Sequence, residues 1–125
     1  ERSRGLGDVY KRQPQDSRVI VANHFPLFTQ EHNRRIMRRA NALQQLVKRF
    51  PSIICYLHGH THRRCLADLR KSNYPIIMDS GSFSHQKHGS FHILELHPDS
   101  LHIYIYGINQ RNGAFILLSH EQFTL

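Results

Sequence analysis

Residues 53–62 read IICYLHGHTH, an apolar run that leads directly into three histidines. The first five of these residues are apolar and partly β-branched, as in strands that are buried in a sheet. A second run of this kind, RVIVA at 18–22, is followed by NHFP at 23–26. Between the two runs, apolar residues recur at intervals of three and four over 31–50, which predicts an amphipathic helix. Strand, helix and strand in this order form a βαβ unit, so the two strands should be parallel neighbours.

The second half of the chain predicts short strands separated by turns. Turn signals lie at 97–100 and at 111–113, and Asn112-Gly113 is a strong hairpin marker. These features indicate an antiparallel meander that follows the βαβ unit without a clear linker. With 125 residues, the chain forms one domain or part of one, of the mixed α/β class. The expected strands of this half are 75–79, 91–96, 101–106 and 114–118.

The composition is that of an ordinary folded protein, with 39% hydrophobic and 21% charged residues, which excludes a disordered tail or a fibrous repeat. No apolar run approaches the roughly 20 residues of a membrane-spanning helix and no signal peptide is recognisable, so we expect a soluble, cytoplasmic protein. Seventeen Lys and Arg against nine Asp and Glu give a net charge of +8, which favours anionic partners. The two cysteines fit a reducing compartment.

The first thirteen residues differ from the rest of the chain. They do not begin with Met, show no apolar periodicity, and include GLGDVYKRQ at 5–13, which resembles translated adaptor or vector sequence. We therefore expect residues 1–13 to be a non-native tail and residues 14–125 to be the natural part of the domain. Without the four basic and two acidic residues of the tail, the net charge is +6, so the basic character persists.

Three histidines follow the ends of the two predicted parallel strands. His24 follows the first strand, and His60 and His62 follow the second. Ligands of open α/β sheets bind where the carboxyl ends of parallel strands meet, so these imidazoles should share a small volume. Gly59 should let the backbone turn there, and the spacing of two residues lets His60 and His62 face different ligands. The arrangement suits two adjacent metal ions, and zinc, manganese and iron all accept imidazole.

Three short segments resemble motifs of the calcineurin-like metallophosphoesterase superfamily. NHFP at 23–26 is similar to the HxP segment of that family, and GHTH at 59–62 is similar to its closing GHxH motif. DSGSF at 79–83 resembles its Gly-Ser loop. The resemblance spans residues 18–106 and implies a four-layer α/β/β/α sandwich, of which this chain would supply one sheet and its covering helix.

The same resemblance implies two divalent or trivalent metal ions, manganese, iron or zinc, with His24 and His60 on one ion and His62 on the other. The family's other ligands belong to DxH, GDxxD and GNH[DE] motifs, and none of these precedes His24. Asn23-His24 is not taken as GNH[DE], because a proline follows two residues later and GHTH comes one helix afterwards. The chain is therefore interpreted as the C-terminal half of the domain, inactive alone, whose partner is the missing N-terminal half. An uncovered apolar face should make it poorly soluble or self-associating.

A metallophosphoesterase hydrolyses a phosphomonoester, phosphodiester or pyrophosphate bond, so the resemblance implies a phosphate-ester substrate. NHFPLF at 23–28 is similar to the corresponding segment of UDP-2,3-diacylglucosamine pyrophosphohydrolases, and cyclic-nucleotide phosphodiesterases and protein phosphatases of the superfamily are alternatives. Three further residues are candidates for contacts with the substrate. They are His58 beside the GHTH motif, and Ser82 and His85 in the loop after the strand at 75–79.

Other interpretations stay open. Four arginines of the predicted helix could grip nucleic-acid phosphates and make the protein a basic binding module, but a solvated helix face explains them better, and we expect no nucleic-acid partner. These arginines are Arg34, Arg35, Arg38 and Arg39. Peripheral membrane contact is left open, as is a degenerate phosphoesterase fold that serves as a scaffold. Cys65 follows His62 by three residues, so a structural zinc site with both is an alternative without an evident fourth ligand. Other histidines, among them His92, His102 and His120, match no ligand spacing and are expected on the surface or on strand faces.

Overall fold

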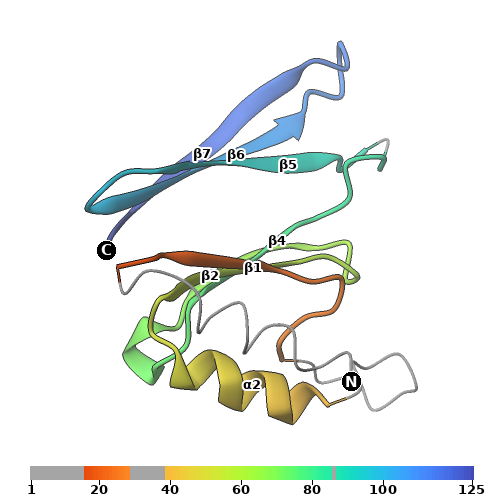
Figure 1. Cartoon of the computed structure of the whole chain (residues 1–125). Helices are drawn as coiled ribbons and strands as arrows, with labels where there is room; N and C mark the ends of the chain where they lie inside the picture. The colour runs from red at the N-terminus through yellow and green to blue at the C-terminus, as the bar shows by residue number, and fades with distance from the viewer. Residues whose placement is uncertain (1–15, 29–38, 86) are drawn as a thin grey trace.

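The computed structural model describes residues 16–28, 39–85 and 87–125. Within them, seven strands form two sheets that face each other, and one α-helix covers the outer side of the first sheet (Figure 1). The tail expected at 1–13 lies outside the described residues.

The first sheet consists of β1 (Val19–Ala22), β2 (Ile53–His58), β4 (Ile76–Ser80) and β3 (Arg64–Asp68), in this spatial order. β1 and β2 are parallel neighbours, which confirms the prediction from the βαβ pattern. β4 is parallel to β2 on its other side, and β3 runs antiparallel to β4 at the edge of the sheet. The carboxyl ends of β1, β2 and β4 therefore lie along one edge, where a ligand is expected to bind.

The second sheet is the predicted antiparallel meander. It consists of β5 (Ser90–Leu96), β6 (Ser100–Ile108) and β7 (Phe115–Thr124), joined in chain order. The hairpin expected at Asn112-Gly113 connects β6 to β7, and Gly113 has the left-handed φ of 70° that such a turn favours. β7 continues well beyond the predicted strand, which ended at 118.

Two expectations about the sheets are wrong. The strand expected at 75–79 belongs to the first sheet as β4 and not to the meander, because Ile76–Asp79 are buried between β2 and β3. β3 was not among the expected strands, since its mostly exposed RCLAD sequence lacks an alternating apolar pattern. The chain therefore supplies strands of two sheets, where one sheet and its covering helix were expected.

The helix α2 (Ala40–Arg49) packs its apolar face on the first sheet. Val47 is buried there, and Leu43 and Phe50 pack around it. Arg39 has a left-handed φ of 61°, so a single right-handed helix across 31–50 is wrong at this residue. Residues 29–38, with Arg34, Arg35 and Arg38, lie outside the described residues. Of the described helices, none combines the length and apolarity that crossing a membrane requires.

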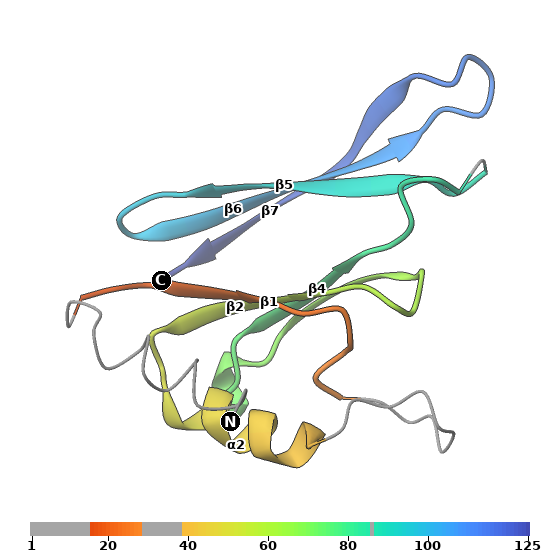
Figure 2. The ribbon, with the colours of Figure 1, turned by 45° about the vertical axis from the view of Figure 1, so that its right-hand side comes forward.

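Figure 2 shows the three layers, which are α2 and the two sheets, and two apolar clusters hold them together. One lies between α2 and the first sheet, and its buried members are Val21, Leu27, Val47, Ile53, Tyr56 and Ile77. The other lies between the sheets and contains Cys55, Ile76, Met78, Leu101 and Ile103. Strands buried on both faces explain the continuous apolar runs at β2 and β4. The described residues thus form three layers, α/β/β, and the predicted fourth layer is not seen among them.

Large apolar side chains are exposed at the outer edge of the second sheet. On β7, Phe115 is 44%, Ile116 42%, Leu117 51% and Leu118 46% exposed. The ring of Phe83, which is 63% exposed, stacks on Phe115 with 5.5 Å between ring centroids. Because β7 pairs only with β6 in the described part of the chain, this run is an apolar edge strand.

Candidate functional site

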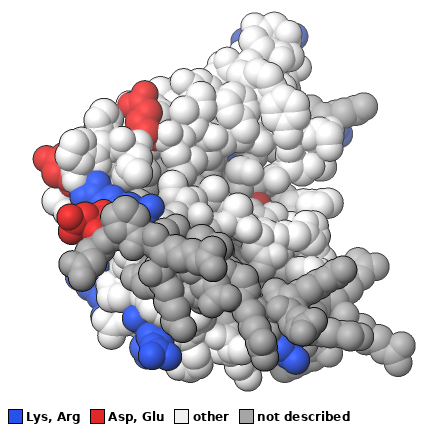
Figure 3. Space-filling model, viewed as in Figure 1, with Lys and Arg blue, Asp and Glu red and all other residues white. Residues whose placement is uncertain are grey.

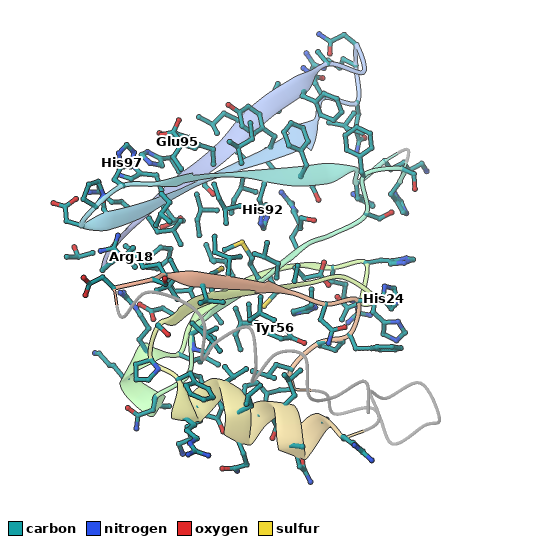
Figure 4. The ribbon with its side chains drawn as sticks, in the orientation of Figure 1. Arg18, His24, Tyr56, His92, Glu95 and His97 are labelled. Carbon is teal, nitrogen blue, oxygen red and sulfur yellow. The ribbon has the colours of Figure 1, made fainter. Side chains whose placement is uncertain are left out.

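His24 and His60 meet at the carboxyl ends of β1 and β2. Their ring nitrogens Nε2 and Nδ1 are 3.1 Å apart, and the ring centroids are 5.1 Å apart. The ring of Phe25 lies 4.9 Å from each imidazole, so an aromatic side chain flanks the pair. Figure 4 shows His24 at one end of the first sheet and Arg18 at the other. Two imidazoles from separate loops therefore share one small volume, as the strand order predicts.

Backbone hydrogen bonds hold the two loops together. The Asn23 N–H donates to Leu57 O at 2.9 Å, and the Gly59 N–H donates to His24 O at 3.1 Å. These bonds continue the β1–β2 ladder past the strand ends. The buried Tyr56 hydroxyl donates to Phe25 O at 2.9 Å, and burial raises the pKa of this phenol. The position of His24 relative to His60 is thus set by the sheet and not by the side chains alone.

Both histidines of the GHTH segment have left-handed backbones. The φ angles are 69° at His60 and 56° at His62. For a residue with a β-carbon this conformation costs roughly 1–2 kcal/mol. The expectation for Gly59 is wrong, because its φ is not left-handed and an added β-carbon would meet only His24 O at 3.9 Å. The turn is made by the two histidines themselves, and such strain persists where the surroundings enforce it.

A fully buried carboxylate supports the GHTH loop from below. Asp79, at the end of β4, accepts a hydrogen bond of 2.6 Å from the Thr61 hydroxyl and one of 2.8 Å from the Gly81 N–H. His58 Nδ1 lies 3.4 Å from the same carboxylate, and its side chain is only 6% exposed. Gly81 has a left-handed φ of 81°, and an added β-carbon would lie 2.6 Å from Ser90 Oγ. The loops after β2 and β4 are therefore joined through Asp79.

Sequence reasoning did not assign a role to Asp79 or Thr61. A carboxylate that directly follows the apolar run IIM is the signal that could have found Asp79, since an acidic residue is rarely buried without partners. Thr61 carries no such signal, because any residue can stand at the x of GHxH. His58, a candidate for substrate contact, lies instead against Asp79 beneath the loop.

The other predicted site residues are less closely grouped. Among the described residues, no group of three or more His, Cys, Asp or Glu side chains is arranged to hold a metal ion. His62 therefore does not complete a three-residue site with His24 and His60, and Cys65 does not form one with His62. Cys65 is exposed on β3, opposite Asp79.

Ser82 and His85 lie in the loop after β4, at the same edge of the sheet as the histidine pair. Ser82 Oγ is 3.4 Å from Ser84 Oγ. His85 Nδ1 accepts from the backbone N–H groups of Lys87 and His88, and its ring packs on that of His88 at 5.1 Å. These contacts give the loop a local structure, and the contact of Ser82 or His85 with a substrate stays a prediction.

Two surface features do not coincide with the histidine pair. A cavity of about 550 Å³ lies at the opposite end of the first sheet, where Arg18, Pro51 and Leu125 line it. Figure 3 shows the described Lys and Arg side chains of one face at separate places and not in one basic patch. Neither feature adds a group to the candidate site.

No protein-family model matches the sequence, and a search of curated proteins finds no match. Among solved structures, the chain is similar to Vacuolar Protein Sorting 29 from Cryptosporidium parvum, with 17% identity, 68% of this chain and 44% of that chain covered, and a TM-score of 0.50. Vps29 from Chaetomium thermophilum is 12% identical, with 71% and 50% covered and a TM-score of 0.51. Wild-type Vps29 from Entamoeba histolytica complexed with Zn²⁺ is 22% identical, with 70% and 47% covered and a TM-score of 0.43.

The first two similarities show that the chain shares the fold of these two Vps29 proteins over the matched residues. The chain spans about half the length of these proteins. Identities of this size carry no activity from one protein to another.

Proposed function

We propose that this chain is the metal-binding C-terminal part of a phosphoesterase, in which His24 and His60 hold one metal ion. The observation that carries the proposal is the 3.1 Å separation of their ring nitrogens at the ends of two adjacent parallel strands. Imidazole nitrogens bind zinc at about 2.0–2.1 Å, so two ligands of one ion lie about 3 to 3.5 Å apart. The donor pair therefore fits the chemistry of zinc, manganese or iron.

The strained loop supports the same proposal. His60 is held in a conformation that the chain would leave if nothing fixed it, and the bond from Thr61 to Asp79 fixes it. A ligand that is oriented before the ion arrives loses less freedom on binding. The ring of Phe25 contacts both imidazoles, in a T-shaped arrangement with His24 and a tilted one with His60. When bound, the metal would act as a Lewis acid on a phosphate oxygen and lower the pKa of a coordinated water.

We further propose that a preceding segment completes the site. That segment would supply the DxH, GDxxD and GNH[DE] ligands and a second ion, which His62 would bind. Two observations support this: the chain spans only about half of similar folds, and the described residues contain two imidazoles at the site without a carboxylate beside them. The substrate would be a phosphate ester, and a UDP-linked pyrophosphate and a cyclic nucleotide are the first compounds to test.

Metal binding by this chain tests the proposal without any need for activity. Zinc titrated into the 125-residue chain should bind, and His24→Ala and His60→Ala should each weaken the affinity at least about tenfold. Isothermal titration calorimetry measures this, with His85→Ala as the matched control because that imidazole is also in a loop at this edge. Unchanged zinc affinity in both variants would exclude the histidine pair as the site.

Hydrolysis is tested in the natural protein with its preceding segment. Metal-dependent cleavage of bis(p-nitrophenyl) phosphate should disappear in His60→Ala and His62→Ala and persist in Arg49→Ala, which changes an exposed residue of α2. Full activity of the histidine variants would contradict catalysis through these residues while leaving the zinc measurement intact.

A non-catalytic scaffold with the same fold is the second candidate. It needs no ligands beyond the two imidazoles of the described residues, whereas the first proposal needs a preceding segment to supply the others. A natural protein that binds no more than one ion and cleaves none of the esters would support this alternative.

A further inference from the structure

Tyr56 is a large side chain in the core beneath the loop that carries His24. It lies on β2, is 0% exposed and packs in the apolar cluster between α2 and the first sheet. Figure 4 shows Tyr56 on the side of the first sheet that faces α2. Phenylalanine would fill the same space without bringing a polar atom into the core. The partners of the hydroxyl therefore indicate what this polar atom does.

The hydroxyl of Tyr56 binds the residues on both sides of His24. It donates its proton to Phe25 O over 2.9 Å. The side chain of Asn23 hydrogen-bonds the same hydroxyl. Because the hydroxyl proton goes to Phe25 O, the amide of Asn23 is the donor in this second bond. The segment 23–25 is therefore attached at both ends to one side chain of the neighbouring strand.

Backbone bonds attach this segment to β2 and to the loop that follows it. The Asn23 N–H donates to Leu57 O, and the Gly59 N–H donates to His24 O. Beyond His24, no backbone bond joins the two loops among the described residues. The Tyr56 hydroxyl thus extends the attachment by one residue, from His24 to Phe25.

Phe25 connects this attachment to the histidine pair. The centroid of its ring lies 4.9 Å from each imidazole. A shift of the Phe25 backbone would therefore move a ring that contacts both His24 and His60, and would change the 3.1 Å separation of their nitrogens. Metal ligands have to be held within about 0.5 Å of their working positions, so a small shift is enough to weaken binding.

We propose that Tyr56 is a positioning residue of the metal site: its hydroxyl holds residues 23–25 so that His24 Nε2 stays opposite His60 Nδ1. This role depends on the proposed function, in which the two imidazoles bind one ion. Asp79 supports His60 in the corresponding way through the Thr61 hydroxyl. Each imidazole of the pair then has a buried polar group beneath its own loop, one from β2 and one from β4.

Removal of the hydroxyl tests this role. In the 125-residue chain, Tyr56→Phe keeps the ring and should raise the zinc dissociation constant about tenfold, as found when a group that orients a metal ligand is lost. Tyr74→Phe is the matched control, because Tyr74 packs against the same apolar cluster, and it should leave the zinc affinity unchanged. Isothermal titration calorimetry measures both affinities, and circular dichroism shows whether the variants are folded.

Cobalt distinguishes positioning from a general loss of structure. The absorption bands of bound Co²⁺ depend on the geometry of its ligands. At saturating cobalt, the bands of Tyr56→Phe should differ from those of the wild type, and the bands of Tyr74→Phe should not. A weakened zinc affinity with unchanged cobalt bands would indicate a structural role and overturn the proposal, and so would an unchanged zinc affinity in Tyr56→Phe.

Two further variants separate this proposal from the proposed function. If His24→Ala weakens zinc binding and Tyr56→Phe does not, only the role of Tyr56 is refuted. Unchanged affinity in both His24→Ala and His60→Ala excludes the metal site itself. If Tyr56→Phe does not fold, Asn23→Ala replaces it, since it removes the other bond of the hydroxyl from a half-buried loop residue. Asn23→Ala should also raise the zinc dissociation constant, and an unchanged value would overturn the proposal.

Discussion

His24 and His60 bring their ring nitrogens to 3.1 Å, and His102 and His120 bring theirs to 2.9 Å. The first pair stands on two loops at the ends of parallel strands. The second stands on neighbouring strands of the meander, where the ring of Tyr104 stacks on His120 at 4.3 Å. His97 packs near His102, at the far end of the molecule from His24 (Figure 4). The distances alone do not distinguish the two pairs.

The support beneath each pair does distinguish them. Under His60 lies a buried carboxylate bonded to the loop, and the backbone above it is left-handed. Under His102 and His120 the backbone is ordinary strand, and their closeness follows from the spacing of cross-strand neighbours. The comparison shows that a functional site is recognised by the contacts that hold its residues in place. Two imidazoles can also approach each other on neighbouring strands of any histidine-rich sheet.

Removing the support should have the largest effect. Asp79→Ala leaves the Thr61 hydroxyl and the Gly81 N–H without their acceptor, and we expect a loss of about 3–5 kcal/mol in the free energy of unfolding. Glu95→Ala removes a carboxylate near the second pair. It should lower the free energy of unfolding by less than about 1 kcal/mol, because Glu95 and its partner His97 are both exposed. Urea denaturation measures both. Similar losses in the free energy of unfolding of the two variants would show that the two histidine pairs do not differ in the support beneath them.

Glycine substitutions should change stability in opposite directions at the two pairs. His60→Gly relieves a left-handed backbone and should stabilise the fold by about 1 kcal/mol, while zinc binding weakens. His120→Gly puts glycine into a strand and should destabilise the fold by about 0.5–1 kcal/mol. Thermal unfolding checks the signs. A destabilised His60→Gly would show that the loop is not strained.

The smallest effect concerns acid stability and the inward-facing His92. Burial, and then Arg64, lower the pKa of His92 below its ordinary 6.5. The unfolded chain then takes up this proton more readily than the folded chain, so stability is complete above about pH 6.5 and is lost as the pH falls towards the folded value. Urea unfolding at pH 7.5 and 5.5 should show this loss in the wild type and less of it in His92→Phe. The outward-facing control His97→Phe should behave like the wild type, and equal losses in all three would contradict the assignment.

Much of the fold could be predicted because each central strand can be recognised from its own residues in the sequence. On β2, Tyr56 is buried against α2 and Cys55 is buried between the two sheets, which leaves a continuous apolar run in the sequence. β3 could not be found in this way, because it is an exposed edge strand. Its pairing with β4 defines it, and its sequence has no apolar pattern. β4 was recognised as a strand but was assigned to the wrong sheet, because sheet membership depends on contacts distant in sequence.

The candidate site likewise has a part that the sequence predicts and a part that it does not. The meeting of His24 and His60 follows from strand order, which the sequence predicts. The role of Asp79 depends on a hydroxyl 18 residues earlier, and no local pattern reports such a bond. His92 was expected on a strand face and lies there, but its burial depends on the opposing sheet.

The exposed run Phe115–Leu118 has a practical consequence for anyone who prepares this protein. A strand edge that is open and carries four exposed apolar residues can pair with a strand of a neighbouring chain. The refolding yield should therefore fall as the protein concentration rises. Refolding by rapid dilution would favour soluble protein, and a lysine in place of one residue of this run would hinder such pairing.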